Sequence, residues 1–278
     1  MGAGRSPNVR TFERSNVRTI LPERMVLDAF RLDGRVAIVT GASRGLGEAM
    51  AVALAEAGAD LVLTARTAPD LERVAAGVRP LGRRAVAVPA DVTVRADVER
   101  VAAEALRAFG GVDVLVNNAG VGSDAAFLDL ADDEWDRVLD TNLRAAYLCT
   151  HVVGRHLVDR RRGKIINIAS VAGLVGRSHM VPYAASKGAL LQLTRSLAVE
   201  WARHNVQVNA ICPGYFRTPM NEQFLDSEAG ARYVRQAVPV GRAGRPAELG
   251  PVAVFLASAA SDYMSGAHIV IDGGRLAR

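Results

Sequence analysis

From residue 35 onwards, short apolar runs alternate with longer helical stretches, and this alternation constrains the fold more than any other feature of the sequence. Strands that are apolar throughout and separated by helices form parallel sheets covered on both faces. The sequence therefore predicts an α/β fold with one doubly wound parallel sheet of about seven strands in a single domain over residues 31–278. The predicted strands are 35–40, 60–65, 84–89, 112–117, 164–170, 207–212 and 268–271.

Composition excludes several other classes of protein. The 278 residues are 50% hydrophobic and 23% charged, which excludes disorder as a description of the whole chain. No run of about eighteen apolar residues occurs, and the N-terminus lacks the apolar segment of a secretory signal. We therefore expect no membrane partner and a cytoplasmic location. Residues 1–30 are polar and Arg-rich without a regular period, which predicts a flexible tail with Met25 as a candidate natural start.

The charge and the cysteines point to neither nucleic acid nor metal. The net charge is +5, of which residues 1–31 carry +3, so the rest of the chain has no strongly basic surface for a phosphate backbone. Cys149 and Cys212 lie in no metal-like or Cys-x-x-Cys spacing. We expect no nucleic-acid partner, no metal site and two free thiols.

A glycine-rich turn follows the first predicted strand and precedes a predicted helix over 48–57. Glycines at these positions let the backbone turn tightly and approach a pyrophosphate, whose charge is met by N–H groups at the helix N-terminus. Because the turn directly follows the first strand, it indicates a dinucleotide site. Its candidate binding residues are Gly41, Ser43, Arg44, Gly45, Leu46 and Gly47.

The same turn also matches Gly-x-Ser-x-Gly, the nucleophile elbow of α/β-hydrolases, with Ser43 as nucleophile and His268 as base. An elbow normally follows earlier strands, one of whose loops supplies an oxyanion donor, and here only the tail precedes it. His268 opens a strand instead of lying on a late loop. A hydrolase is therefore a less favoured alternative, and a non-catalytic nucleotide-binding protein is another.

The end of the second predicted strand bears on the choice of cofactor. An NAD enzyme carries an acidic residue there to bind the adenosine ribose. In this chain Ala65 and Arg66 occupy the place, and Arg44 lies in the glycine turn. Because guanidinium groups pair well with phosphate, the two arginines favour NADP(H), with NAD(H) still possible.

Three residues at and after the end of the fifth predicted strand indicate acid–base chemistry. Ser170 ends this strand, and Tyr183 and Lys187 follow four residues apart, on one face of a helix. An ammonium beside a phenol stabilises the phenolate and lowers its pKa, so that Tyr183 can act as acid or base toward a carbonyl oxygen. A non-catalytic protein would leave all three residues without a role.

Together with further motifs, these residues resemble the short-chain dehydrogenase/reductase family over residues 32–274. The resemblance implies a Rossmann-type fold that binds NAD(P)(H) and exchanges a hydride between a secondary alcohol and a ketone. Tyr183 is then the acid/base, Ser170 hydrogen-bonds the substrate oxygen and Lys187 holds the nicotinamide ribose. Asn142, on a helix predicted over 135–148, orders a water behind Lys187. The further cofactor-binding residues that it implies are Asp91, Val92, Asn118, Ala119, Gly120, Pro213, Gly214 and Thr218.

Residues 215–240, which close over the substrate in this family, mix apolar and polar side chains and suit a small polar molecule. The sequence of residues 210–221 resembles that of gluconate 5-dehydrogenases and 2-deoxygluconate 3-dehydrogenases, with 3-oxoacyl-carrier-protein reductases as the alternative. Arg177, His179 and Arg217 are candidates for a substrate carboxylate, although such a residue near a loop is more often solvated. The resemblance also implies a homotetramer, paired through helices over 132–160 and 180–203.

Overall fold

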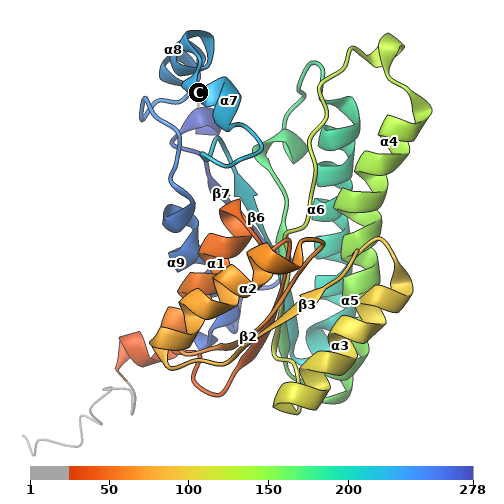
Figure 1. Cartoon of the computed structure of the whole chain (residues 1–278), viewed down its shortest axis with the longest axis vertical. Coiled ribbons are helices and arrows are strands. Elements are labelled where there is room, and N and C mark those ends of the chain that lie inside the picture. Colours follow the sequence, from red (N-terminus) through yellow and green to blue (C-terminus); the bar gives the residue numbers. More distant parts are fainter. Residues whose placement is uncertain (1–24, 278) are drawn as a thin grey trace, which may run out of the picture.

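A single seven-stranded sheet forms the centre of the computed structural model, which describes residues 25–277 (Figure 1). The strand order is β3-β2-β1-β4-β5-β6-β7, and all neighbouring strands are parallel. The predicted fold class and number of strands are therefore confirmed. The strands are β1 (Val36–Thr40), β2 (Asp60–Ala65), β3 (Ala85–Pro89), β4 (Val114–Asn117), β5 (Gly163–Ile168), β6 (Val206–Pro213) and β7 (His268–Ile271).

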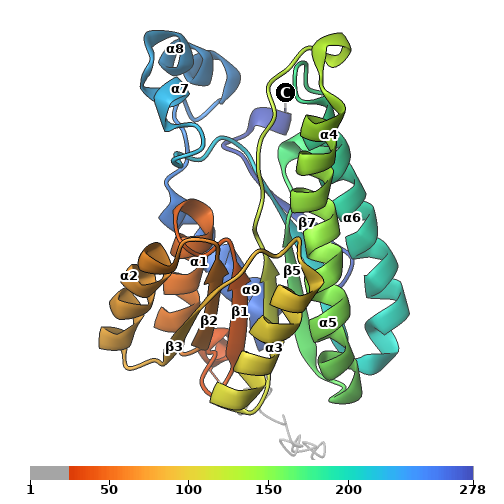
Figure 2. The same cartoon turned by 45° about the vertical axis from the view of Figure 1, so that its right-hand side comes forward.

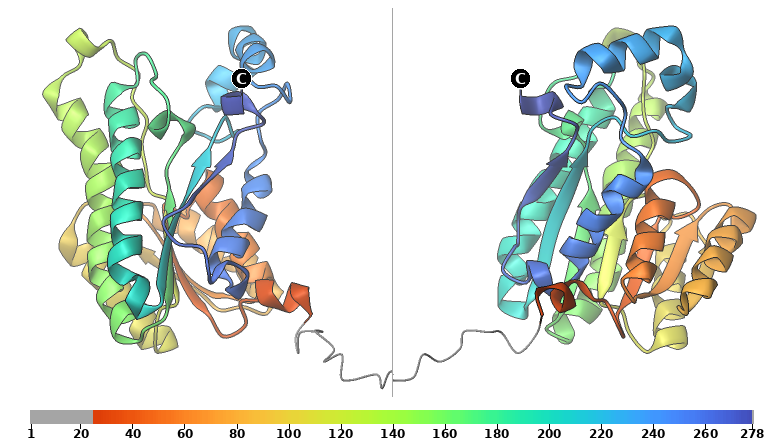
Figure 3. Two further views of the ribbon diagram at one scale, coloured as in Figure 1. Left: turned by 180° about the vertical axis from the view of Figure 1, so that it is seen from behind. Right: turned by 90° about the vertical axis from the view of Figure 1, so that its left-hand side faces the viewer.

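Helices cover both faces of the sheet, and each face has its own apolar core. One layer holds α1 (Gly45–Glu56), α2 (Ala68–Val78) and α9 (Gly250–Ala257). The other holds α3 (Arg95–Phe109), α5 (Ala145–Asp159) and α6 (Val181–Trp201). Two further views show these layers on opposite sides of the sheet (Figure 3). Every residue of β1, β4, β5 and β6 is buried, which explains why these strands read as continuous apolar runs.

The helix predicted over 132–160 is interrupted by a change of pitch. It consists of α4 (Asp132–Leu139), a π-helical turn η4 (Asp140–Arg144) and α5. Asn142 lies in this turn, where its side chain is buried and bonded to the backbone of Val121. Such single π turns often occur at functional sites.

The fifth strand and the N-terminal segment differ from the prediction. β5 ends at Ile168 instead of residue 170, because the Ser170 hydroxyl accepts the N–H of Ala172 and opens a short turn. Residues Val26–Phe30, which the sequence places in the tail, form a 3-10 helix, with the ring of Phe30 6.2 Å from that of Phe255. Residues 1–24 lie outside the described part of the chain.

Two short helices, α7 (Glu222–Asp226) and α8 (Glu228–Ala237), stand beyond the carboxyl ends of β6 and β7 (Figure 2). The C-terminal residues lie beside them. Their small apolar core of Leu225, Val234 and Val238 is separate from the two cores of the sheet. This part of the molecule therefore depends on local packing.

Within residues 25–277, no helix is both long and apolar enough to cross a membrane, and no three His, Cys, Asp or Glu side chains are grouped to hold a metal ion. Cys149 and Cys212 are free, as predicted, and buried. Burial raises the pKa of Cys149 to about 12 and that of Cys212 to about 11, which leaves both thiols unreactive at neutral pH.

Candidate active site

A cleft of about 610 Å³ runs along the carboxyl edge of the sheet. Ligands of doubly wound sheets bind in this position. The cleft brings together Ser170 and all the cofactor-binding residues predicted from the sequence. These are Gly41, Ser43, Arg44, Gly45, Leu46, Gly47, Arg66, Asp91, Val92, Asn118, Ala119, Gly120, Tyr183, Lys187, Pro213, Gly214 and Thr218.

The glycine turn packs so tightly that side chains are excluded from it. A Cβ atom on Gly47 would collide with the carbonyl oxygen of Gly41. Gly41 itself has a φ of +63°, which favours glycine. The Asn118 amide donates to the carbonyl oxygens of Thr40 and Gly41, at 2.9 and 3.1 Å, and holds the turn against β4.

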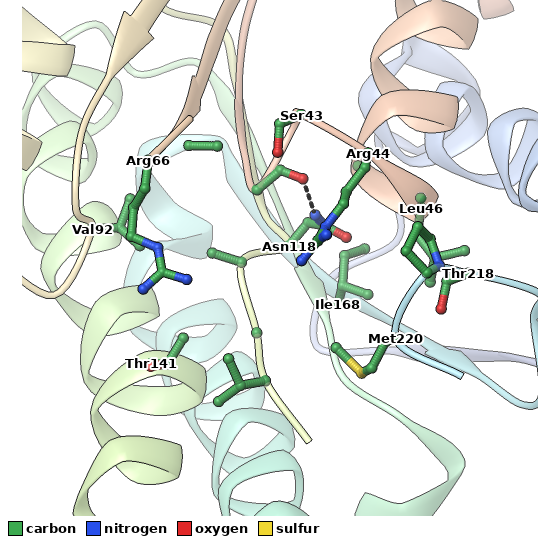
Figure 4. Close-up of a pocket in the computed structure, with 18 of the residues that line it drawn as sticks. Ser43, Arg44, Leu46, Arg66, Val92, Asn118, Thr141, Ile168, Thr218 and Met220 are labelled. Carbon is green, nitrogen blue, oxygen red and sulfur yellow. Dashed lines mark hydrogen bonds between the residues drawn. The ribbon is translucent and has the colours of Figure 1, made fainter. Parts of the chain in front are cut away.

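The N-terminus of α1 opens into the cleft without a side-chain cap. Its first N–H groups lack intrahelical partners and suit a phosphate. Two guanidinium groups project into the same cleft, from Arg66 at the end of β2 and from Arg44 at the start of α1 (Figure 4). Neither has a hydrogen-bond or ion-pair partner among the described residues. This part of the cleft therefore fits a dinucleotide with an additional phosphate.

Ser170, Tyr183 and Lys187 meet at the other part of the cleft. Lys187 Nζ donates to the Ile168 carbonyl oxygen at 2.8 Å and lies 5.7 Å from the centre of the Tyr183 ring. The Ser170 hydroxyl already accepts the N–H of Ala172, so its own proton is free to point toward Tyr183 or a ligand. Three of the four residues that the sequence predicts to be catalytic are thus close together, and Asn142 is the fourth.

Burial governs the protonation of this group. It raises the pKa of Tyr183, and a hydrogen bond with Ser170 offsets only part of that effect. It lowers the pKa of Lys187 to about 8. Burial therefore works against the lowering of the Tyr183 pKa that was expected from Lys187. Among the protein groups alone, Tyr183 is a neutral phenol at pH 7, in the form that donates a proton.

Asn142 lies one layer behind the cleft and does not line it. Its amide group bonds to both backbone groups of Val121, at 2.8 and 3.0 Å, and donates to the Ser186 hydroxyl at 3.1 Å. A Cβ atom on Gly120 would lie 3.2 Å from Asn142 Oδ1 and 3.5 Å from Lys187 Nζ. Gly120 thus allows Asn142 and Lys187 to approach the same backbone segment, and the role of Asn142 in a proton relay stays a prediction.

Several cleft residues escaped the sequence analysis. Thr141 precedes Asn142, and Ile168 and Ala169 precede Ser170, so proximity to a chosen residue was the signal available for them. The remaining missed residues lie just after strand ends or on helices, and no sequence motif indicates that they face the cleft. The missed lining residues are Ala65, Thr67, Asp70, Ala90, Thr93, Val121, Arg137, Asp140, Thr141, Ile168, Ala169, Phe216 and Pro219.

The structure distinguishes the three candidates for a substrate carboxylate. Arg217 pairs with Asp226 and Glu222, so its charge is already balanced. His179 is exposed and lies 3.9 Å from Asp124. Arg177 is half-buried, and the hydrogen bonds of its guanidinium go to tyrosine hydroxyls.

The geometry does not support a hydrolase. β1 and β7 are separated by β4, β5 and β6. A strand spacing of about 4.8 Å places them roughly 19 Å apart, so His268 on β7 cannot serve as a base for Ser43, which follows β1.

Comparison with known proteins agrees with this geometry. A family model described as enoyl-(acyl carrier protein) reductase matches residues 41–275. The chain belongs to the short-chain dehydrogenase/reductase family. The predicted oxidoreductase class is therefore confirmed, and the hydrolase and non-catalytic alternatives are wrong.

Two relatives and one solved structure illustrate the similarity. The chain is 40% identical to the 5-keto-D-gluconate 5-reductase of Escherichia coli (strain K12), over 90% of this chain and 98% of that protein. It is 40% identical to the 2-dehydro-3-deoxy-D-gluconate 5-dehydrogenase of Dickeya dadantii, over 91% and 100%. The gluconate 5-dehydrogenase of Burkholderia cenocepacia, solved in complex with NADP and tartrate, superposes with a TM-score of 0.87 at 39% identity, over 91% and 100%.

Proposed function

We propose that the protein is an NADP(H)-dependent oxidoreductase that interconverts a secondary alcohol and a ketone in a sugar acid. The observation that carries the proposal is one cleft that holds an acid–base group of Ser170, Tyr183 and Lys187 beside a dinucleotide-type turn. The names of the relatives support the substrate class, and the NADP-containing neighbour supports the cofactor. Because these relatives act on sugar acids, a 3-oxoacyl-carrier-protein reductase is the less favoured alternative.

The cofactor supplies or accepts the hydride when it is bound. The backbone of Gly41–Gly47 and the N-terminus of α1 would hold its pyrophosphate. Arg44 and Arg66 would bind the 2′-phosphate, and Asp91 and Val92 would contact the adenine. The absence of an acidic residue at the end of β2 favours NADP(H) over NAD(H).

In the direction of ketone reduction, Tyr183 donates its proton to the carbonyl oxygen as negative charge develops there. Ser170 donates a hydrogen bond to the same oxygen and disperses that charge. Lys187, when charged, stabilises the phenolate that Tyr183 becomes, and Asn142 orders the water through which a proton returns. In the oxidation direction the same groups act in reverse order.

Assembly and location remain proposals. A homotetramer paired through α5 and α6 would cover apolar side chains that the single chain exposes, among them Tyr147 and Val199, which are 45% and 82% exposed. Besides further copies of the chain, the expected partner is the substrate, a small carbonyl or alcohol compound. A cytoplasmic location stays a prediction from the sequence.

The test is reduction of 5-keto-D-gluconate with NADPH by the purified protein, alongside the Tyr183→Phe variant. We expect the variant to lose about 10²- to 10⁴-fold in kcat, the usual contribution of a positioned acid or base, with little change in NADPH affinity measured by fluorescence. Undiminished turnover in Tyr183→Phe would refute the mechanism. Turnover of 3-oxoacyl thioesters in place of the sugar acid would refute the substrate class.

A further inference from the structure

Four side chains from separate segments meet near the ends of β6 and β7. We call Arg177, Tyr215, Tyr233 and Arg275 the Arg–Tyr cluster. Arg177 donates to both tyrosine hydroxyls, with 3.1 Å to that of Tyr233, and Arg275 Nη2 also donates to Tyr233 at 3.1 Å. The guanidinium carbon of Arg275 lies 4.9 Å from the centre of the Tyr215 ring. Two cations are thus held side by side by two phenols.

Neither guanidinium has a carboxylate partner among residues 25–277. Nη1 of Arg275 is fully buried and makes no hydrogen bond. A buried, charged donor without an acceptor costs free energy, and because this atom is closed to solvent, a ligand reaches it only if the Arg275 side chain moves. The contrast with Arg217 is informative, because that arginine, two residues after Tyr215, is neutralised by Asp226 and Glu222.

The phenols leave the positive charge of the cluster in place at neutral pH. Burial by itself would raise the pKa of Tyr233, but hydrogen bonds from Tyr215, Arg177 and Arg275 outweigh it and lower the pKa to about 8. Burial raises the pKa of Tyr215. Both phenols are therefore mainly neutral at pH 7, and the cluster carries the charge of its two arginines.

The cluster adjoins the cleft through Gly214, which lines the cleft and directly precedes Tyr215. A Cβ atom on Gly214 would lie 2.7 Å from Cα of Asp272, so the chain after β6 packs directly on the chain that leads to Arg275. The carboxyl ends of the two strands thus bring the cluster to the edge of the sheet where the cleft lies.

Arg177 does not itself line the cleft, but its chain segment leads from one catalytic residue to the next. It lies on the segment between Ser170 and Tyr183, both of which line the cleft. Arg44 and Arg66, in contrast, follow β1 and β2, which lie on the other side of the sheet centre from β6 and β7. Arg44 and Arg66 line the cleft itself, whereas Arg177 and Arg275 lie next to its lining, and none of the four has a carboxylate partner among the described residues.

We propose that Arg177 and Arg275 bind the carboxylate of the substrate, and that Tyr215 and Tyr233 position the two guanidinium groups. Guanidinium donors match the planar geometry of a carboxylate, and both arginines make hydrogen bonds to tyrosine hydroxyls and to no carboxylate of the described residues. The proposal rests on the proposed sugar-acid function and adds the residues by which the enzyme selects an acid over a neutral ketose.

The test compares an acidic and a neutral substrate, 5-keto-D-gluconate and 5-keto-D-fructose, with NADPH. We expect Arg177→Gln and Arg275→Gln to raise KM for the acid roughly 10- to 100-fold, as expected for lost hydrogen bonds to a charged group, with kcat nearly constant. KM for the neutral ketone should not change. Arg275→Lys should recover part of the loss, because it restores the charge without the guanidinium geometry.

Arg232→Gln is the matched control, since Arg232 adjoins Tyr233 on α8 but is exposed and paired with Glu228. It should leave KM for both substrates unchanged. Glutamine variants that keep the wild-type KM for the acid would overturn the proposal. So would variants that lose the acidic and the neutral substrate equally, because the cluster would then only support the fold.

A binding measurement separates failure of this proposal from failure of the proposed function. Calorimetric titration of the NADP⁺-loaded protein with tartrate reports on carboxylate binding without turnover. If 5-keto-D-gluconate is not reduced but tartrate binds the wild type and not the glutamine variants, the proposed function fails and the carboxylate site stands. If tartrate binds all of them equally, or binds none and the acid is not a substrate, the carboxylate site is refuted.

Discussion

The two ends of the cleft are built in different ways. At the cofactor end, backbone groups of consecutive residues form the turn Gly41–Gly47, and Arg44 belongs to that same turn. At the substrate end, Arg177, Tyr215, Tyr233 and Arg275 come from four segments that span about 100 residues of sequence. The first arrangement is a local property of the chain, whereas the second exists only after β5, β6 and β7 have paired.

The cofactor end and the substrate end of the cleft also differ in how they pack against the rest of the molecule. The turn is held between α1 and β4, against residues that belong to the large cores of the sheet. The α7–α8 segment has a small core of the buried residues Leu225, Val234 and Val238. We infer that the cofactor end is rigid and that the substrate end opens locally at low cost in free energy.

The largest effect is expected at the cofactor end. Gly47→Ala would place a Cβ atom against the backbone carbonyl of Gly41 and against the side-chain amide of Asn118, which is itself held by hydrogen bonds to that turn. We expect NADPH binding, measured by fluorescence titration, to fall below detection or the protein to lose its fold. Gly77→Ala is the control, because nothing lies within 4 Å of a Cβ atom at that exposed helical position. Normal NADPH affinity in Gly47→Ala would show that the turn is not rigid.

The next effect concerns the choice of cofactor. Arg66→Asp should weaken NADPH binding by at least about tenfold more than NADH binding, because the guanidinium is replaced by a carboxylate that repels the 2′-phosphate. Calorimetry with both cofactors measures the two affinities. Arg79→Asp, the same change of charge at an exposed residue outside the cleft, should alter neither. Equal losses for NADPH and NADH in Arg66→Asp would mean that Arg66 is merely solvated.

The third prediction concerns how kcat for ketone reduction depends on pH. Lys187 has a pKa of about 8, so it is charged below that pH and loses its charge as the pH rises through it. Since the charged form stabilises the phenolate of Tyr183, kcat should fall above about pH 8. The Tyr233→Phe variant is the control, because Tyr233 has a similar pKa but lies in the Arg–Tyr cluster. A kcat profile that stays flat to pH 9.5, or one that Tyr233→Phe abolishes, contradicts the assignment to Lys187.

A smaller effect tests the difference in rigidity. Leu54→Ala, in the large core between α1 and the sheet, should reduce the free energy of unfolding by about 2–5 kcal/mol. Leu225→Ala, under α7 and α8, should change the Tm for global unfolding much less and instead raise KM for the substrate. Thermal melts and steady-state kinetics on both variants measure these effects. An equal drop in Tm for the two variants would show that the substrate end unfolds together with the sheet.

The motifs of the cofactor end and of the catalytic group were predictable because each is local. Tyr183 and Lys187 lie one helical turn apart, and the glycine turn is continuous in sequence, so spacing alone indicates which residues meet. The protonation of the group was not predictable, since burial, which raises the pKa of Tyr183, depends on everything that packs around it. Thr141 and Phe216 were missed for a related reason, because their inward positions follow from how helix and strand ends pack.

The sequence by itself determined the parallel α/β sheet, the dinucleotide turn and the catalytic group, since strand periodicity and short-range spacing encode all of them. Only the tertiary structure decided which of Arg177, His179 and Arg217 remains without a counter-ion. That outcome depends on which carboxylates fold against each side chain, and Asp226 reaches Arg217 while no carboxylate of the described chain pairs with Arg177. Arg275 has no local motif at all, and its buried, unpaired donor results from the packing of the chain end on Tyr215 and Tyr233.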